Sequence, residues 1–450
     1  MSHPTPSTQT APPQVGLQDA RRIAFAAFVG TALEWYDYFL FGTAAALVFN
    51  RLFFTDLDPS GATLAAFATF GVGFAARPIG AVVFGWIGDR YGRRPALLTT
   101  IVMIGSATGL IGILPDYLAV GIAAPIMLAV LRLVQGFAVG GEWGGATTIA
   151  IEHSPEKQRG RFAALVQIGS PVGTLVSSGT FALVLMMPPE VFDAWGWRIP
   201  FLAAFPLLGV ALYIRLKVEE SPVFKQLVES GDQAKVPVIE LFRTSGRRLL
   251  IAVAAAMLGV GGFYIMTTFV VSYGTNVLEV DRQVMVNATL VAAVLQMVVT
   301  IFAGRLADRF GPGRMTVVGA VATGLAAFPL FWLIDTRSAL GITVAVSIGI
   351  ALITIAYAVT GALLAELFPP RLRYSGVSLG YNIAGALSGF LPLIATALLT
   401  VGGGASWPAA LVLIGICIIT AIGGAFGERM RLTDDGLART SPQTIDARAD

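Results

Sequence analysis

Cysteine, histidine and charged residues are all scarce in this chain of 450 residues. The single cysteine, Cys417, lies in an apolar run, which excludes an intrachain disulfide. Of the two histidines, His3 lies in a stretch rich in Pro and Thr and His153 in a polar segment, so we expect neither to be a buried ligand. Without a cluster of Cys, His and Asp residues, we expect no metal ion, no cofactor and no enzymatic site.

The low charge itself indicates the class of protein. Charged residues make up 13% of the chain, against about a quarter in soluble domains, and hydrophobic residues make up 55%. This composition, with a mean hydropathy of +0.75, is typical of a protein solvated by lipid. The net charge is only +3, and no basic patch with interleaved aromatic residues indicates binding to nucleic acid.

Long apolar runs occupy most of the sequence. A helix that crosses a bilayer needs about 20 mostly apolar residues. Twelve stretches reach that length, at approximately 23–49, 62–87, 95–114, 119–150, 162–187, 199–217, 248–273, 285–303, 315–334, 340–365, 376–400 and 407–427. The sequence therefore predicts an all-α membrane protein with twelve transmembrane helices.

Basic residues are unevenly distributed among the loops between these runs. If the N-terminus is cytoplasmic, 24 of the 30 lysines and arginines face the cytoplasm. Only Arg51, Arg198, Arg282 and Arg337 then face the outside. Cytoplasmic loops of membrane proteins carry an excess of Lys and Arg, so we expect both termini in the cytoplasm.

Two short patterns occur twice in the chain, at nearly the same offset. The first pairs four residues with counterparts 219 positions later, Gly85, Asp89, Arg90 and Gly92 with Gly304, Asp308, Arg309 and Gly311. The second pairs three residues with counterparts 214 positions later, Glu152, Pro155 and Arg159 with Glu366, Pro369 and Arg373. These matches predict two similar six-helix bundles, at 23–217 and 248–427. We expect 218–247 to be a cytoplasmic linker, and 1–22 and 428–450 to be cytoplasmic tails, the first of them disordered.

The loop at 85–94, GWIGDRYGRR, resembles the signature of the major facilitator superfamily, which carries it after the second helix and a weaker copy after the eighth. Segments at 30–38, 76–80, 132–136, 140–145 and 159–160 resemble the metabolite:proton symporter family within it. That family includes transporters of shikimate, alpha-ketoglutarate, citrate and proline/betaine. The shikimate-like branch is nearest, through 47–50 and 63–71. Residues 428–450 show no heptads, unlike the coiled coil of the osmosensing proline/betaine members.

The resemblance implies a secondary active transporter in the inner membrane of a bacterium. Its two pseudo-symmetric bundles would expose a central site alternately to each side of the membrane, and the repeat favours this mechanism over a channel. We expect a monomer that takes up a small organic anion with a proton, such as shikimate or a keto or dicarboxylic acid. A zwitterionic osmolyte such as betaine or proline is the alternative substrate. Because carboxylates also bind sodium, the coupling ion stays open between the two.

Ionisable residues inside the bilayer are the first candidates for the site, because they are unfavourable there unless they are paired or line a pathway. Five lie well within the predicted spans, all in the N-terminal half: Glu34, Asp37, Arg77, Arg132 and Glu142. At about 1.5 Å per residue, Asp37 and Arg132 lie about 20 Å into their spans. We expect Asp37, with Glu34 as second candidate, to take the proton and Arg132 to bind the substrate carboxylate. The alternative is a permanent structural ion pair between the two helices.

Arg77 is open to two interpretations, a second anion ligand or a structural partner of Glu142. Glu142 lies near the cytoplasmic end of its span, where a structural or gating role fits better than contact with substrate. The charged residues of the repeated loops are expected to latch the cytoplasmic gate, or only to set topology. The predicted gating residues are therefore Glu142 and the loop residues Asp89, Arg90, Arg93, Arg94, Arg159, Asp308 and Arg309.

Neutral polar and aromatic side chains within the spans can bond to substrate hydroxyls or stack on a ring, although helix packing explains each of them as well. The N-terminal half offers Gln135, and Tyr36 beside Trp35 and Tyr38. The C-terminal half offers Tyr264, Thr267, Gln296, Tyr357, Tyr381 and Asn382.

Overall fold

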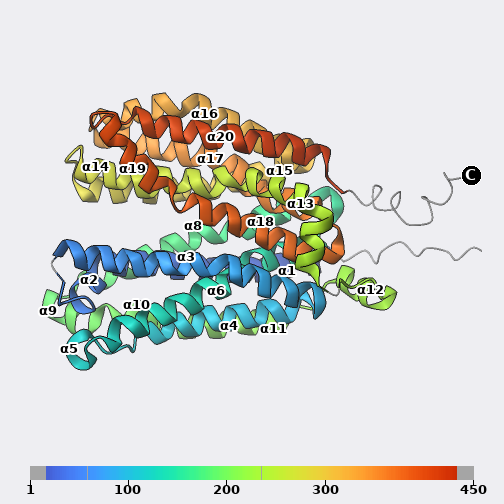
Figure 1. The fold of residues 1–450 in the computed structure, drawn as a ribbon, viewed down its shortest axis with the longest axis horizontal. Coiled ribbons are helices and arrows are strands. Elements are labelled where there is room, and N and C mark those ends of the chain that lie inside the picture. The colour runs from blue at the N-terminus through green and yellow to red at the C-terminus, as the bar shows by residue number, and fades with distance from the viewer. Residues whose placement is uncertain (1–16, 58, 235, 433–450) are drawn as a thin grey trace, which may run out of the picture.

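The computed structural model describes residues 17–57, 59–234 and 236–432, and over those residues it contains helices and no strands. The N-terminal half and the C-terminal half each form a bundle, drawn in blue to green and in yellow to red in Figure 1. The two bundles lie side by side, with their long helices running along the interface. Each bundle supplies six crossings, which confirms the predicted all-α architecture of two six-helix bundles.

The N-terminal bundle builds several of its crossings from more than one helix. In chain order they are α1 (Leu17–Ala44) with η1 (Ala45–Phe49), α3 (Pro59–Arg90), α4 (Arg93–Ile111), α6 (Ala123–Glu152), α7 (Arg159–Gln167) with α8 (Gly169–Val184), and α10 (Arg198–Leu202) with α11 (Ala204–Leu216). Short helices connect them: α2 (Asn50–Leu52), α5 (Tyr117–Val120), η2 (Glu156–Gln158), α9 (Pro189–Val191) and η3 (Phe192–Gly196).

The C-terminal bundle follows α12 (Pro222–Ser230), a short helix between the two halves. Its crossings are α13 (Pro237–Met257) with η4 (Leu258–Gly262), η5 (Ile265–Phe269) and α14 (Val270–Asn276), then α15 (Arg282–Phe310), α16 (Pro312–Asp335), α17 (Ala339–Leu367), α18 (Arg373–Ser388) with α19 (Leu391–Val401), and α20 (Trp407–Arg429). The turn η6 (Pro370–Leu372) precedes α18. The bundles meet where α3, α6, α7 and α8 pack against α13, α15, α17 and α18.

Among the residues that the structure describes, ten crossings are long and apolar enough to span a membrane by length and composition alone. The other two are α1, which carries Glu34 and Asp37, and α18 with α19, which are interrupted at Gly389 and Phe390. Acidic residues and helix breaks are tolerated in a membrane only where they face protein or water. Glu34 and Asp37 are buried, in agreement with that rule.

The outer surface of the bundles is apolar. Leu183, Leu325 and Trp332 are 69%, 78% and 65% exposed, and many other large apolar side chains lie beside them. A protein in water rarely exposes so much continuous apolar surface. The helices therefore present to their surroundings the surface that a lipid bilayer solvates.

One end of the molecule, which we call the linker end, carries α12 and the end of α20, at the right of Figure 1. The turn from α3 to α4 and the turn from α15 to α16 have the same backbone conformation. Gly92 and Gly311 adopt φ values of 123° and 96°, which glycine reaches without the strain that a Cβ atom would cause. The repeat in the sequence thus gives the same turn in both bundles.

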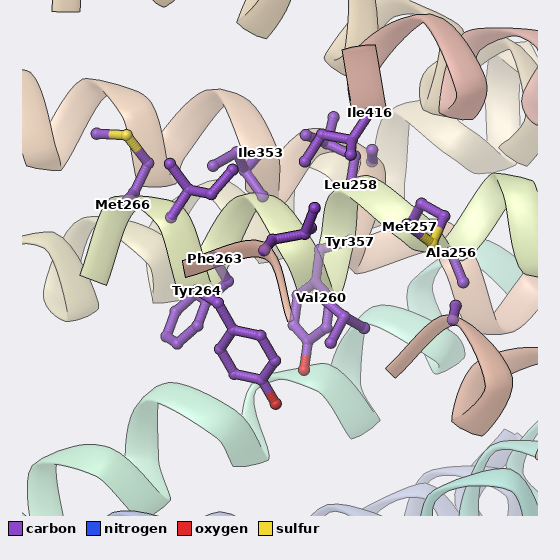
Figure 2. Packing of buried hydrophobic residues seen from close by; sticks show 14 of the residues in the cluster. Ala256, Met257, Leu258, Val260, Phe263, Tyr264, Met266, Ile353, Tyr357 and Ile416 are labelled. Carbon is purple, nitrogen blue, oxygen red and sulfur yellow. The ribbon is translucent and has the colours of Figure 1, made fainter. Parts of the chain in front are cut away.

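The seventh crossing is irregular where it passes the interface. Two π-helical stretches, η4 and η5, follow α13, and such segments often mark functional sites. A Cβ atom at Gly259 in η4 would lie 3.0 Å from the ring of Tyr357, so the glycine lets that ring pack closely. Figure 2 shows the rings of Tyr264 and Tyr357 directed away from the apolar cluster and toward a helix of the N-terminal half, drawn in cyan.

Two helices begin well before their apolar runs. α1 begins at Leu17, before the run that starts at 23, and α13 begins at Pro237, inside the polar segment 218–247. α13 bends at Ser245, where φ is −129° and ψ is 16°. An apolar run ends at the membrane surface, whereas a helix can continue beyond it through polar residues. Residues 1–16 and 433–450, where most of the predicted tails fall, lie outside the described residues.

Candidate functional site

An ion pair joins α1 to α6 inside the N-terminal bundle, between the two residues that the sequence indicated. Arg132 Nη1 lies 3.3 Å from Asp37 Oδ2, and the two side chains are only 4% and 2% exposed. The Thr108 hydroxyl on α4 donates to Asp37 Oδ1 at 2.6 Å, and the Gln135 amide donates to the same oxygen. The Asp37 carboxylate of α1 is therefore held by partners from two other helices of the same bundle, α4 and α6.

The Arg132 side chain reaches its partner through a narrow space between α3 and α6. Its guanidinium lies 4.4 Å from the centre of the Phe41 ring, and Nη1 also donates to Gln135 Oε1 at 3.3 Å. A Cβ atom at Gly73 would lie 2.8 Å from Arg132 Nε. The absence of a side chain at Gly73 thus gives the arginine room to pass α3.

Glu34 lies one helical turn before Asp37 and is also buried. Its Oε2 has no hydrogen-bond partner among the described residues, and the carboxylate interacts electrostatically with Arg77 of α3. The Arg77 guanidinium lies over the Phe74 ring at 4.7 Å and near the Tyr38 ring at 5.9 Å. Within the part of the chain that the structure describes, Arg77 forms no ion pair. Glu34 and Arg77 therefore make fewer hydrogen bonds and ion pairs than Asp37 and Arg132 do.

Glu142 is the partner of Arg215 and not of Arg77, so the predicted structural pairing of Arg77 with Glu142 is wrong. Both Arg215 Nη atoms bond to the Glu142 carboxylate, Nη1 at 3.0 Å, and the Thr100 hydroxyl donates to it at 2.6 Å. These residues come from α6, α11 and α4. Glu142 thus stabilises packing inside the N-terminal bundle.

Aromatic rings cross the interface between the halves. Trp143 of α6 stacks on Tyr381 of α18, with ring centres 3.6 Å apart. Tyr38 of α1 stacks on Tyr264 of the seventh crossing, with ring centres 6.3 Å apart. Of the predicted site residues, Tyr264 and Tyr381 therefore lie where the two bundles face each other.

Three further neutral candidates lie in different settings. The Asn382 amide donates to the Gly140 carbonyl oxygen at 2.8 Å, so it bridges α18 and α6. The Gln296 side chain is buried on α15. The Tyr36 hydroxyl donates to the Pro200 carbonyl oxygen at 2.6 Å, inside the N-terminal bundle. That contact contradicts the expectation that Tyr36 faces the substrate.

At the linker end, Asp89 joins the bundles through the first turn of α18. Its carboxylate accepts hydrogen bonds from the backbone N–H groups of Tyr374 and Ser375, at 3.2 and 2.9 Å, and pairs with Arg93 at 3.1 Å. A helix N-terminus carries unpaired N–H groups and a partial positive charge, which favour a carboxylate there. Asp89 is fully buried in this contact.

Glu152 extends the contact between the bundles. Its carboxylate pairs with Arg93 of its own half and with Arg373 of the other half, both at 3.3 Å. The Ser221 hydroxyl donates to it at 2.5 Å. The Arg93 guanidinium also donates to the Pro370 carbonyl oxygen, at 2.7 Å, so a single buried cluster fastens the two halves at this end.

The repeated counterparts make the mirror contacts. Glu366 lies 3.9 Å from Arg159 of the other half, and Asp308 pairs with Arg161 at 2.7 Å and accepts its backbone N–H at 3.2 Å. Glu366 pairs more closely with Arg431 of its own half, at 2.5 Å. The two copies of the Glu and Arg pattern thus cross over from one bundle to the other.

A sequence model of the Major Facilitator Superfamily matches residues 27–358. The chain belongs to this superfamily. It is 41% identical to the shikimate transporter of Escherichia coli strain K12, over 92% of this chain and 96% of that relative. It is 34% identical to the proline/betaine transporter of Salmonella typhimurium strain LT2, over 90% of this chain and 82% of that relative. These findings confirm the family resemblance, and the chain is a multi-pass membrane transporter and not an enzyme.

A solved structure of the major facilitator XylE, a proton:xylose symporter bound to 6-bromo-6-deoxy-D-glucose, has the same fold. The TM-score is 0.73 over 91% of this chain and 95% of XylE, at 17% sequence identity. At that identity the likeness concerns the fold alone. It confirms the arrangement of twelve helices in two bundles.

Three of the predicted gating residues make no contact with the opposite bundle that the structure records. Arg90 and Arg309 are exposed, and the Arg309 guanidinium lies 5.3 Å from the ring of Phe310 beside it. Arg94 donates to the Leu216 carbonyl oxygen at 2.8 Å, within the N-terminal half. Of the predicted gating residues in this major facilitator, Asp89, Arg93, Arg159 and Asp308 are therefore the ones that lie at the contact between bundles.

Sequence reasoning missed two contributors at the linker end. Glu220 accepts the backbone N–H groups of Arg93 and Arg94, at 3.0 and 3.1 Å, so the linker caps the start of α4. His153, which lies in a polar segment of the sequence, is only 4% exposed, and its Nδ1 lies 2.8 Å from the Ile149 carbonyl oxygen. Burial lowers the pKa of His153, so the ring is neutral at pH 7. The capping role of Glu220 was not predictable, because its position in the polar segment after an apolar run does not indicate that it contacts α4.

Proposed function

We propose that this major facilitator takes up a small organic anion together with a proton, by alternating access. The observation that supports it best is the buried pair of Asp37 and Arg132. A carboxylate and a guanidinium inside a membrane are kept where ions or substrates pass. Here they lie on different helices of one bundle, so they need not separate when the bundles move.

Coupling follows from competition for Arg132. A proton on Asp37 removes the negative charge that holds the guanidinium at 3.3 Å. In a medium of low dielectric constant, the arginine then attracts a carboxylate strongly and can bind it through two parallel hydrogen bonds. Arg77, which interacts electrostatically with Arg132, is a second cation for the same carboxylate. The anion and the proton therefore favour each other's binding.

The relatives support an organic acid as substrate. One of them is named a shikimate transporter, and shikimate carries one carboxylate that suits the two arginines. Because other relatives are named proline/betaine transporters, a zwitterion is the alternative substrate, and its carboxylate would bind the same two arginines, Arg132 and Arg77. Competition for uptake between these compounds separates the two.

We further propose that the linker end faces the cytoplasm of a bacterium, in its inner membrane. The excess of Lys and Arg in the loops at this end supports that orientation. The contacts of Asp89 and Glu152 then close the cytoplasmic side. Bundles at 23–217 and 248–427, joined by the linker at 218–247, would move as two bodies within a monomer.

The test is Asp37→Asn in proteoliposomes. The amide keeps the shape of the side chain but takes no proton, so we expect accumulation driven by a pH gradient to be lost while exchange of labelled for unlabelled substrate persists. Asp232→Asn, at an exposed aspartate of the linker, is the matched control and should accumulate substrate like the wild type. Accumulation by Asp37→Asn at the wild-type level would refute the role of Asp37 in coupling. Uptake by the wild type that is driven by a sodium gradient in place of the pH gradient would refute coupling to protons.

A further inference from the structure

The groups that face each other between the bundles form a second polar cluster, beside the pair of Asp37 and Arg132. We call it the tyrosine site. It consists of Glu34, Tyr38 and Arg77 from the N-terminal half and Tyr264, Tyr357 and Tyr381 from the C-terminal half, and its members interact electrostatically with one another. Each half supplies three residues, so the site is complete only when the bundles are together.

Several polar atoms at this site are buried without a hydrogen bond. Within the described residues, Glu34 Oε2 and Tyr357 Oη make no hydrogen bond of normal geometry, and Ser170 and Tyr381 are the side chains nearest to the Tyr357 hydroxyl. Tyr357 is 3% exposed and Glu34 is 4% exposed. Unpartnered buried polar atoms are rare in folded proteins, and each one calls for an explanation. A ligand with hydroxyl groups would supply the missing hydrogen bonds.

The charges of the tyrosine site restrict what that ligand can be. Arg77 forms no ion pair with any described residue, so its charge is available to pair with one carboxylate. Glu34 lies near it and would repel a second carboxylate on the same ligand. The stacked rings of Tyr381 on Trp143 and of Tyr264 on Tyr38 add flat apolar surfaces. Such surfaces pack well against a ring of carbon atoms.

We propose that the tyrosine site selects a hydroxylated ring that bears a single carboxylate, with Glu34 and Tyr357 as the residues that recognise its hydroxyl groups. The carboxylate lies toward Arg77 and Arg132, and a ring hydroxyl donates to Glu34 Oε2 while another bonds to Tyr357 Oη. The inference rests on the proposed function, which requires only that the substrate is an anion. It adds which part of the substrate determines specificity.

The experiment compares two probes that share a ring and a carboxylate. Shikimate carries three hydroxyl groups, and cyclohex-1-ene-1-carboxylate carries none. Dissociation constants for the purified full chain are measured by calorimetry, and uptake in proteoliposomes. A site built for hydroxyl groups rejects a ligand that lacks them, because its own polar groups stay unpaired, so the wild type should bind shikimate at least about 10-fold more tightly.

Two variants remove the recognition without removing the cations. Tyr357→Phe deletes one oxygen, and Glu34→Gln keeps the shape but removes the charge. Each should weaken shikimate binding about 5- to 10-fold relative to cyclohex-1-ene-1-carboxylate, as expected for one hydrogen bond. Tyr357→Phe, which changes no charge, should leave the dissociation constant of cyclohex-1-ene-1-carboxylate within about twofold, because that probe makes no such bond. Tyr213→Phe, at an exposed tyrosine of α11, should change neither.

The outcomes separate this inference from the proposed function. Equal losses for both probes, or no loss for either, would overturn the tyrosine site while proton-driven uptake of an acid left the proposed function intact. A wild type that binds betaine and neither acid would overturn both. Size-exclusion profiles identify a variant that fails to fold, and in that case the other variant decides.

Discussion

Buried charges determine how the helices of the N-terminal bundle pack. A carboxylate in a medium of low dielectric constant is strongly unfavourable unless an opposite charge and hydrogen bonds accompany it. Glu142 has both, from Arg215 and Thr100. Because these partners come from α11 and α4, the ion pair fixes α6 against both helices. Its position inside one bundle indicates a role in stability.

Replacing only one member of this pair should be worse than replacing both. Arg215→Met leaves the Glu142 carboxylate buried without its counter-charge, which should lower the free energy of unfolding by about 3–5 kcal/mol. In the double variant Glu142→Gln with Arg215→Met, the amide is neutral and still accepts from Thr100, so much of that loss should return. Thermal unfolding of the purified chain measures both. A double variant no more stable than Arg215→Met would contradict this account.

The sequence predicted the members of the site better than their partners. Charges inside apolar runs need partners, so the contact of Asp37 with Arg132 could be expected from their depth alone. The partner of Glu142 could not, because Arg215 lies at the end of a run and looks like a charge that sets topology. Tyr36 was misplaced for a similar reason. Periodicity gives the face on which a ring lies, but not which helix packs against that face.

At the scale of helices, glycine permits the closest contacts between the bundles. A Cβ atom at Gly160, at the start of α7, would lie 2.8 Å from the Gly304 carbonyl oxygen and from Asp308 Oδ1 on α15. The Gly304 carbonyl oxygen belongs to the helix backbone, so it cannot move aside as the end of a flexible side chain can. Small residues allow membrane helices to approach in this way. The contact of α7 with α15 therefore tolerates no side chain at Gly160.

Gly160→Val should hold the linker end apart. We expect the population closed at that end to fall, and with it the rate of transport, because alternating access needs both ends to close in turn. Gly179→Val is the matched control, since a Cβ atom at Gly179 on α8 meets nothing within 4 Å. The readout is alkylation of a cysteine placed at Ser378, which is buried at the interface, in a Cys417→Ser background. Equal alkylation rates in the two valine variants would contradict the prediction.

The helices themselves were largely predictable, since a membrane requires long apolar runs and the chain has twelve of them. The polar extensions of these helices were not predictable, because hydropathy indicates where a helix leaves the lipid and not where its backbone hydrogen bonds end. α13 illustrates the difference: eleven of its residues, 237–247, were assigned to the linker. The π-helical stretches after it were also missed, since they depend on the fit of Gly259 against Tyr357.

At the scale of the whole molecule, the two copies of the repeat exchange partners across the interface. Glu152 pairs with Arg373, and Glu366 approaches Arg159, the counterpart of Arg373 in the other bundle. The exchange is unequal. Glu152 lies 3.3 Å from Arg373, whereas Glu366 lies 3.9 Å from Arg159 and is held by Arg431 of its own half at 2.5 Å. The closed state of the linker end therefore depends more on Glu152.

This inequality predicts an order among three matched variants. Hydrogen bonds to charged groups contribute about 1.5–3 kcal/mol, so Glu152→Gln should shift the ratio of open to closed molecules at the linker end by about tenfold or more. Glu366→Gln should shift this ratio less, because the Glu366 carboxylate pairs mainly with Arg431 of its own bundle. Glu219→Gln, at an exposed residue paired with Lys225, should shift it least, since exposed pairs contribute little.

Spin labels at the exposed positions Arg90 and Arg309 report that ratio, because they lie on opposite bundles at the linker end and take no part in the contacts. Longer distances between the labels should gain population in the order Glu152→Gln, Glu366→Gln, Glu219→Gln. An equal gain for the first two would mean that the repeat acts symmetrically and that the 3.9 Å contact counts as much as the 3.3 Å one. A gain for Glu219→Gln would instead assign closure to the net charge of the linker, since that variant changes charge without touching any contact between the halves.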